Sequence, residues 1–269
     1  MARSTKCKGY AKCGARLPLP ILDGSQQYTI GRRAGHNVVV ACLPSGVYRT
    51  TSATTVLSQM LPTFARLRFG LMVGIGGGMP REDTDIRLGD VVGSLPGEIS
   101  GGVNQYNFGK TLHNERFQRI GSSLNNPPQF LLMAISQMCS DHTIGKRDPY
   151  PHHSWIVSGN QVIKEAAKRD ALAQEMDILC FEAEAAGLMD QFPCLVFRGI
   201  CDYCDSHKNK ECQGYAALAA AAARTPLDGS LSQKPVLVGR EAEIAMIGEL
   251  MNPPLSIAIC GLGESERRR

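Results

Sequence analysis

Arg68-Phe-Gly-Leu-Met-Val-Gly-Ile-Gly-Gly-Gly-Met-Pro80 is the stretch that decides the fold. It begins with an apolar run of strand length and continues into a cluster of glycines. A continuous apolar strand is typical of a sheet that is covered on both faces. Glycines let backbone amides approach a ligand closely. The stretch therefore predicts a buried strand followed by a glycine-rich loop, which either cradles an anion or a sugar or simply forms a tight turn.

Similar apolar runs recur on both sides of this stretch and alternate with helical patterns. Apolar residues at helical spacing predict helices, and short continuous apolar runs predict buried strands. Strands are expected at residues 37–43, 90–92, 178–181 and 194–199, and helices at 50–60, 129–140, 161–174 and 215–223. Strands that alternate with helices indicate an α/β protein with a mainly parallel sheet covered on both faces. Such sheets bind ligands at the carboxyl ends of their strands.

The composition narrows the class of protein. The chain has 269 residues, of which 43% are hydrophobic and 20% charged, and a formal net charge of +4. These values exclude a disordered chain. They do not indicate a nucleic-acid-binding surface, because the basic residues are interleaved with acidic ones. No apolar window is long enough to span a membrane. The ten cysteines are dispersed, and most lie in apolar runs (Cys42, Cys180, Cys194 and Cys260), where a free thiol acts as a small core residue. A cytoplasmic location is therefore expected.

The glycine cluster matches neither of the common nucleotide-binding patterns. A dinucleotide-binding pattern that starts at Gly74 and Gly76 would need its third glycine at Met79, and no Gly-Lys-Ser/Thr follows for a phosphate loop. The cluster also lacks a neighbouring cation for a phosphate group. We expect a poor phosphate site here unless Arg33, Arg49 or Arg81 reaches it.

Paired glutamates follow the strand expected at 178–181. Glu182 and Glu184 lie two residues apart, before an apolar helix. Two such carboxylates can accept hydrogen bonds from a diol, or handle a proton and a developing positive charge. Acidic residues are also favoured at the N-terminus of any helix, so a purely structural role stays open.

An aspartate follows the last strand. Asp202 lies one step past the apolar run of this strand, where active-site groups of parallel sheets commonly lie, although it could equally form a turn. Cys201 and Cys204 nearby have a C-x-x-C spacing, with His207 and Cys212 beyond them. Zinc is disfavoured because no second C-x-x-C or paired His completes a ligand set.

Taken together, these motifs resemble the purine nucleoside and uridine phosphorylase superfamily, which includes the methylthioadenosine/S-adenosylhomocysteine nucleosidases. The resemblance covers about residues 28–223 and is strongest to the fungal branch of the family, which is usually fused to a nucleotide-binding receptor module. It rests on the segments 70–78, 85–92, 101–110, 156–163, 181–187 and 198–205. It implies a three-layer α/β/α domain around a twisted, mostly parallel mixed sheet.

The resemblance also implies a reaction and a set of site residues. The family cleaves the N-glycosidic bond of nucleosides, with phosphate or water as co-substrate and no other cofactor or metal. By this resemblance Asp202 hydrogen-bonds or protonates the purine N7, and Glu184 grips the ribose hydroxyls. The substrate, a small-molecule nucleoside or nucleotide, would further contact Gly74, Ile75, Gly76, Gly77, Val162, Ile163, Glu182 and Ala183. The family is also compatible with a homo-oligomer, and it implies neither nucleic-acid nor membrane partners.

Three departures from the family pattern bear on the reaction. Ala183 stands where the family has a methionine under the ribose, which should weaken sugar binding. Ile75 and Met72 stand where phosphorylases carry polar or cationic residues, which favours hydrolysis over phosphorolysis. The family's opening strand and its acidic residue have no counterpart in residues 1–27, and a missing sheet strand would expose an edge.

Four segments are expected along the chain. They are an irregular segment at 1–27, a nucleoside phosphorylase-like domain at 28–224, a linker at 225–235 and a truncated NTPase-like stub at 236–269. The stub resembles the entrance to a receptor-type NTPase, in which the segment Ser256–Gly263 would hold a strand that leads to a phosphate loop, but the loop is broken at residues 264–267. The leading interpretation is a nucleosidase-type enzyme. The alternative is a catalytically impaired nucleoside-sensing or signalling domain of an NLR-like receptor.

Overall fold

The computed structural model describes residues 28–33, 36–43, 49–81, 83–98, 100–113, 117–121, 124–143, 151–208, 210–223 and 255–261. The segments predicted at 1–27 and 225–235 and most of the stub at 236–269 therefore lie outside the described residues. The main sheet has nine strands in the order β1-β2-β11-β3-β10-β4-β8-β5, with β9 paired to both β3 and β8. Most pairings are parallel, and β1–β2, β10–β4 and β3–β9 are antiparallel.

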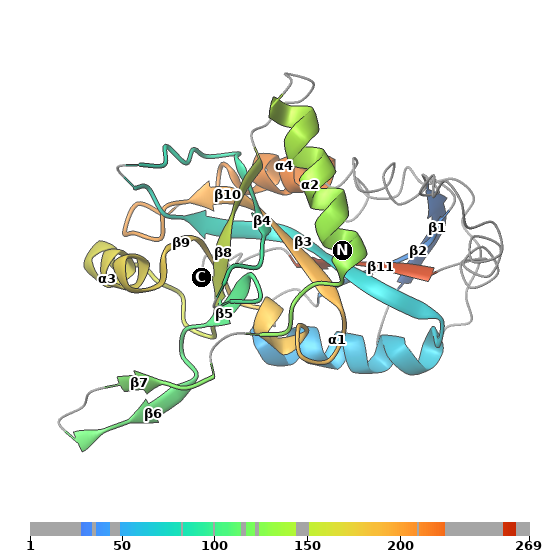
Figure 1. Cartoon of the computed structure of the whole chain (residues 1–269), viewed down its shortest axis with the longest axis horizontal. Coiled ribbons are helices and arrows are strands. Elements are labelled where there is room, and N and C mark those ends of the chain that lie inside the picture. Colours follow the sequence, from blue (N-terminus) through green and yellow to red (C-terminus); the bar gives the residue numbers. More distant parts are fainter. Residues whose placement is uncertain are drawn as a thin grey trace, which may run out of the picture.

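The strands follow the apolar runs of the sequence. They are β1 (Tyr28–Arg33), β2 (His36–Cys42), β3 (Leu67–Gly78), β4 (Val91–Ser94), β5 (Val103–Gln105), β8 (Pro151–Ser158), β9 (Ile178–Glu182), β10 (Cys194–Asp202) and β11 (Leu255–Gly261). A separate two-stranded sheet consists of β6 (Gly109–Thr111) and β7 (Phe117–Arg119). It projects from the body of the protein (Figure 1).

Helices cover both faces of the main sheet. They are α1 (Thr50–Thr63), α2 (Gln129–Thr143), α3 (Ala166–Met176) and α4 (Gln213–Ala223), with the short 3-10 helix η3 (Ala185–Gly187). Figure 1 shows α1 on one side of the sheet and α2 and α4 on the other. On β3, Met72 packs with the residues of α1, whereas Leu71 and Val73 pack with those of α2 and α4. Because side chains alternate along a strand, one strand supplies both cores. The predicted three-layer α/β/α fold is confirmed.

The pairings close part of the sheet on itself. Residues Gly70–Gly77 of β3 pair with β10, and the end of β3 pairs with β9 at Gly77 and Gly78. Since β10 pairs with β4, β4 with β8 and β8 with β9, these five strands form a ring. The ring brings β3, β9 and β10 together at one place.

Three local expectations are corrected by the structure. The glycine segment Gly74–Gly78 is not a loop but the second half of β3. The helix expected at 161–174 begins at Ala166, so that residues 161–165 are free to line a pocket. Cys42 is disulfide-bonded, whereas Cys180 and Cys194 are the buried free thiols that the sequence predicts.

The strand expected to open an NTPase lies instead in the middle of this sheet. β11 pairs in parallel with β2 on one side and with β3 on the other, with Gly261 opposite Gly74. Residues 255–261 are thus inserted between two strands from the amino-terminal part of the sequence. The identification of the remaining stub as an NTPase entrance stays a prediction. In the described part of the chain, no helix combines the length and the apolar character that a membrane crossing requires.

We expect Ala258→Pro to destabilise the domain by about 2–4 kcal/mol, because proline removes a backbone donor from a strand that is paired on both sides. Chemical denaturation would measure the loss. Lys110→Pro in the projecting β6–β7 sheet is the matched control and should cost much less. Equal unfolding midpoints for wild type and Ala258→Pro would show that β11 does not hold the sheet together.

Candidate active site

One pocket lies where β3, β9 and β10 meet, and its free volume, open to solvent, is about 500 Å³. The lining comes from the glycine half of β3, the segment before α3, the end of β9 with the following turn, and the end of β10 with the loop that leads to α4. The residues are Ile75, Gly76, Gly77, Gln161, Val162, Ile163, Phe181, Glu182, Ala183, Glu184, Cys201, Asp202, Cys204, Lys208 and Gln213.

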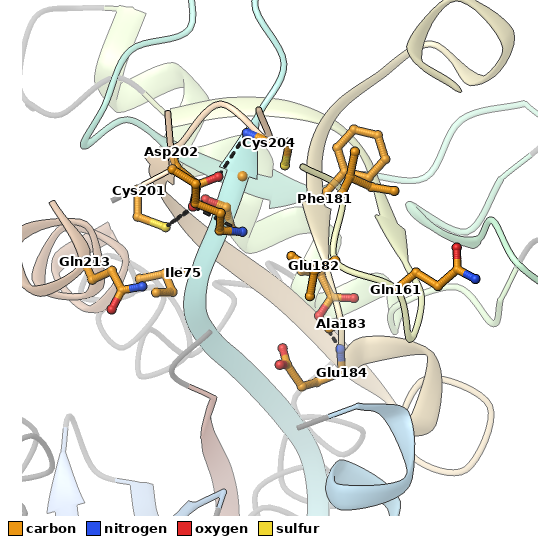
Figure 2. Close-up of a pocket in the computed structure, with 15 residues that line it drawn as sticks. Ile75, Gln161, Phe181, Glu182, Ala183, Glu184, Cys201, Asp202, Cys204 and Gln213 are labelled. Carbon is orange, nitrogen blue, oxygen red and sulfur yellow. Dashed lines mark hydrogen bonds and ion pairs between the residues drawn. The ribbon is translucent and has the colours of Figure 1, made fainter. Parts of the chain in front are cut away.

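The pocket gathers every site residue that the sequence singled out, with the exception of Gly74. Figure 2 shows Asp202 with Cys201 and Cys204 at one end, and Glu182 and Glu184 at the other. Gly74 lies deeper in the sheet, opposite Arg198 on β10 and Gly261 on β11. It does not reach the pocket because the glycine segment is a strand, and the strand carries Gly74 away from the opening.

Glycines of β3 allow the pocket walls to come close together. A Cβ atom on Gly76 would lie 2.5 Å from the Cys180 sulfur, and one on Gly77 would lie 2.0 Å from the Cys204 sulfur. Both distances are far below van der Waals contact. The glycines are therefore needed for close packing of β3 against β9 and against the loop after β10, rather than for a turn.

A buried charge cluster forms the floor beside Glu184. The guanidinium of Arg198, on β10, has no exposed surface, and its Nη2 contacts carboxylate oxygens of both Glu182 and Glu184, the latter at 3.2 Å. Two carboxylates share one cation, so the cluster carries one excess negative charge when both are ionised. The Nε and Nη1 atoms of Arg198 have no hydrogen-bond partner among the described residues.

The two glutamates have different surroundings. Glu182 accepts hydrogen bonds from the backbone N–H groups of Glu184 and Ala185, at 3.0 and 2.9 Å, in addition to its contact with Arg198. Its carboxylate therefore organises the turn into η3, as the structural interpretation of an acid before a helix predicts. Burial raises the pKa of Glu184 to about 7, despite the opposing effect of Arg198. Glu184 is thus the carboxylate that can change its charge near neutral pH.

Asp202 combines a turn with a position in the pocket wall. Its Oδ1 accepts a hydrogen bond from the backbone N–H of Cys204 at 3.0 Å, and Cys204 adopts a left-handed conformation with φ of 55°. Its Oδ2 accepts from the Cys201 thiol at 3.2 Å and lies 3.4 Å from the ammonium nitrogen of Lys208. All three neighbours are donors, so Asp202 is held as an acceptor at this end of the pocket.

Several pocket residues were missed by the sequence reasoning. Gln161 lies in the segment that was assigned to a helix, and Gln213 begins α4. Lys208 lies in a polar loop, where a lysine gives no signal by itself. Arg198 did give a signal, because a lone arginine inside an apolar strand needs a buried partner. The paired glutamates two strands away in the ring were the available candidates.

The cysteines near Asp202 show no metal-binding arrangement. Cys201 and Cys204 are buried, whereas the side chain of His207 is 90% exposed. Within the described ranges no three side chains of His, Cys, Asp or Glu could together hold a metal ion. Burial raises the pKa of the Cys204 thiol to about 12 and that of Cys201 further, so both thiols keep their protons at neutral pH.

Comparisons with solved structures show the fold. The chain is similar to the 5′-methylthioadenosine/S-adenosylhomocysteine nucleosidase from S. pneumoniae, whose structure contains a transition-state inhibitor. That match has a TM-score of 0.65 and 17% identity, and it covers 84% of this chain and 95% of the other. Futalosine hydrolase of Helicobacter pylori matches with a TM-score of 0.62 and 16% identity over 83% and 91% of the two chains. The nucleoside phosphorylase-like fold is therefore shown.

A curated relative is more similar in sequence. An NLR-like protein, described as nucleotide-binding with leucine-rich repeats, from Hyaloscypha variabilis is 41% identical over 253 residues, covering 74% of this chain. The chain spans 25% of the length of that relative. No protein-family profile matches the chain.

We expect Arg198→Met to cost about 3–5 kcal/mol of stability, because it leaves two buried carboxylates without their shared cation. Urea unfolding at pH 8 would measure the loss. Arg87→Met removes an exposed ion pair and should leave the midpoint unchanged. A wild-type midpoint in Arg198→Met would contradict the described cluster.

The raised pKa of Glu184 predicts a pH dependence of stability. The folded protein binds this proton more tightly than the unfolded chain, whose glutamate has its ordinary pKa of 4.5. The contribution of Glu184 to the free energy of unfolding is therefore full below about pH 4.5 and is lost as pH rises to about 7. Its size is on the order of 3 kcal/mol. Unfolding of wild type and Glu184→Gln, compared at pH 5 and pH 8, should show the decline in wild type alone. Parallel pH profiles would refute it.

Proposed function

We propose that this domain cleaves the N-glycosidic bond of a purine nucleoside or nucleotide, with water as the acceptor. The observation that carries the proposal is that Asp202 and Glu184 line one pocket from opposite ends. A nucleoside has two halves that need different partners, a base and a sugar. Asp202 would hydrogen-bond the N7 side of the base, and Glu184 would hold the ribose hydroxyls.

The surroundings of Glu184 suit the chemistry at the sugar. Cleavage of an N-glycosidic bond passes through a sugar with oxocarbenium character, as in glycoside hydrolysis. The excess negative charge of the Arg198 cluster would stabilise the positive charge that develops on the sugar. A carboxylate whose pKa is about 7 is also well suited to accept a proton from a hydroxyl or from attacking water at neutral pH.

The pocket lining favours water over phosphate. Ile75 contributes an apolar side chain to the wall, and Met72 is buried against Arg198 instead of facing the pocket. Arg81 is paired with Asp83 and Asp177, outside the pocket lining. Among the described residues Lys208 is the cation that lines the pocket, and it lies at the base end. A phosphate dianion beside the sugar would lack the cationic partners that it normally has.

A second function, the sensing of a nucleoside without efficient turnover, is favoured by Ala183 and by the similarity to the NLR-like relative. Ala183 lines the pocket where a larger side chain would pack under the ribose, so the sugar would be held weakly. The 41% identical relative is named as an NLR-like protein. Both observations support a domain that senses a nucleoside without efficient turnover, as part of a larger receptor.

Incubation of the purified protein with adenosine, inosine, methylthioadenosine and ATP, with and without phosphate, would test the proposal by chromatography of the free base. We expect release of base that does not depend on phosphate. Asp202→Asn and Glu184→Gln should each lower kcat by about 10²–10⁴. Asp170→Asn, which alters an exposed carboxylate on α3, is the control and should retain wild-type activity.

Two outcomes would contradict the proposal. Folded protein that releases no base from any of the four compounds excludes catalysis on them, and calorimetric binding under the same conditions would then favour the sensing domain. Strictly phosphate-dependent release would instead overturn hydrolysis while retaining cleavage of the glycosidic bond.

A further inference from the structure

We infer that Lys208 is a catalytic residue, which donates a proton to N7 of a departing 6-aminopurine while Asp202 accepts a hydrogen bond from the exocyclic amino group. This inference rests on the proposed function and adds to it a base class and a proton donor. Lys208 lines the pocket, and its ammonium nitrogen lies 3.4 Å from Asp202 Oδ2. Its side chain is 22% exposed, against 4% for that of Asp202, so Lys208 is the more solvent-accessible member of the pair.

The neighbours of Asp202 identify Lys208 as the proton donor. The carboxylate accepts from the Cys204 backbone N–H and from the Cys201 thiol, and it is paired with Lys208. The backbone N–H does not titrate, and burial raises the pKa of the thiol far above neutral. Of these three donors, the ammonium is therefore the one that we assign to the proton transfer. It is also held by an ion pair at the wall where the base would lie.

The pair of groups matches one kind of purine edge. Adenine presents an amino donor at N6 and an acceptor at N7 along the same edge, whereas guanine presents acceptors at both O6 and N7. The 6-oxopurine hypoxanthine has the same two acceptors as guanine. An acceptor carboxylate beside a donor ammonium complements the adenine edge. In a 6-oxopurine, O6 would face the Asp202 carboxylate, so that two acceptors would meet. Otherwise O6 and N7 would both have to accept hydrogen bonds from Lys208 alone.

The step balances in atoms and electrons. The C1′–N9 bond breaks, and its electron pair passes to the purine ring as the ammonium of Lys208 transfers a proton to N7. Water forms the new bond to C1′ and releases a proton, which returns through solvent to the neutral amine. The products are the free sugar and neutral adenine, and no oxidant, reductant or further co-substrate is consumed.

The test uses Lys208→Met, which removes the donor, and Lys208→Arg, which keeps one. Lys210→Met alters an exposed lysine two residues away and is the matched control. Each protein is assayed with adenosine and inosine, with ATP and ITP, and with 4-nitrophenyl riboside, whose leaving group needs no protonation. Binding of adenosine and of 7-deazaadenosine, which lacks the N7 acceptor, is measured by calorimetry.

We expect wild type to prefer each adenine compound over its 6-oxo counterpart by about 10- to 100-fold. Lys208→Met should lower kcat on adenine compounds by about 10²–10⁴, while cleavage of the nitrophenyl riboside stays within about threefold. Lys208→Arg should restore part of the loss, and Lys210→Met should behave as wild type. Wild type should bind adenosine about tenfold more tightly than the 7-deaza compound, and Lys208→Met should bind both alike.

The outcomes separate this inference from the proposed function. Suppose that wild type cleaves adenosine. If Lys208→Met then cleaves it equally well, or is slowed equally on adenosine and on the nitrophenyl riboside, the inference is overturned and the proposed function is retained. If wild type cleaves nothing, the proposed function and the catalytic role of Lys208 fall together. In that case, a Lys208-dependent preference for adenosine over 7-deazaadenosine in binding would still support the assigned base recognition.

Discussion

The buried guanidinium of Arg198 is the interaction on which the rest of the site depends. It lies in the middle of β10, has no exposed surface, and contacts Glu182 and Glu184 at the end of β9. Burying three charges is costly unless they compensate one another. The strands that carry them must therefore meet, and the ring of five strands makes them do so. One cation serves two carboxylates, so the floor of the pocket carries an excess negative charge when both are ionised. Burial first, and the neighbouring Glu182 carboxylate second, raise the pKa of Glu184.

Glycines make this arrangement sterically possible. At Gly76 and Gly77 even a methyl group would overlap the sulfur atoms of Cys180 and Cys204. The second half of β3 can thus approach β9 and the loop after β10 more closely than any strand with side chains could. The same closeness brings Asp202 and Glu184 to the walls of one pocket (Figure 2). The glycine segment acts as a packing surface first, and its contact with a ligand follows from that.

The two ends of the pocket differ in their electrostatics. Around Glu184 the environment is buried and negatively charged, which suits a sugar that develops positive charge. Around Asp202 the neighbours are hydrogen-bond donors, and one of them is the ammonium of Lys208. At one end the pocket therefore presents the Asp202 carboxylate, an acceptor, beside the Lys208 ammonium, a donor. At the other end it presents Glu184, which can accept a proton. A nucleoside, with a hydrogen-bonding base at one end and hydroxyls at the other, is a chemical match for this polarity.

The sequence by itself determined the α/β class and the apolar strands β2, β3, β9 and β10. It also determined the helices, whose apolar residues recur at helical spacing, because all of these patterns are local. It further determined that Asp202, Glu182 and Glu184 lie at or just after the ends of strands, and a family resemblance supplied their expected roles. Only the tertiary structure decided what those strands meet. That Gly74–Gly78 is a strand, that Arg198 joins both glutamates and that Lys208 reaches Asp202 depend on the closure of the ring. The placement of β11 between β3 and β2 likewise joins residues about 190 and about 220 positions apart. Backbone hydrogen bonding between strands is indifferent to sequence distance, so no local pattern could have revealed these contacts.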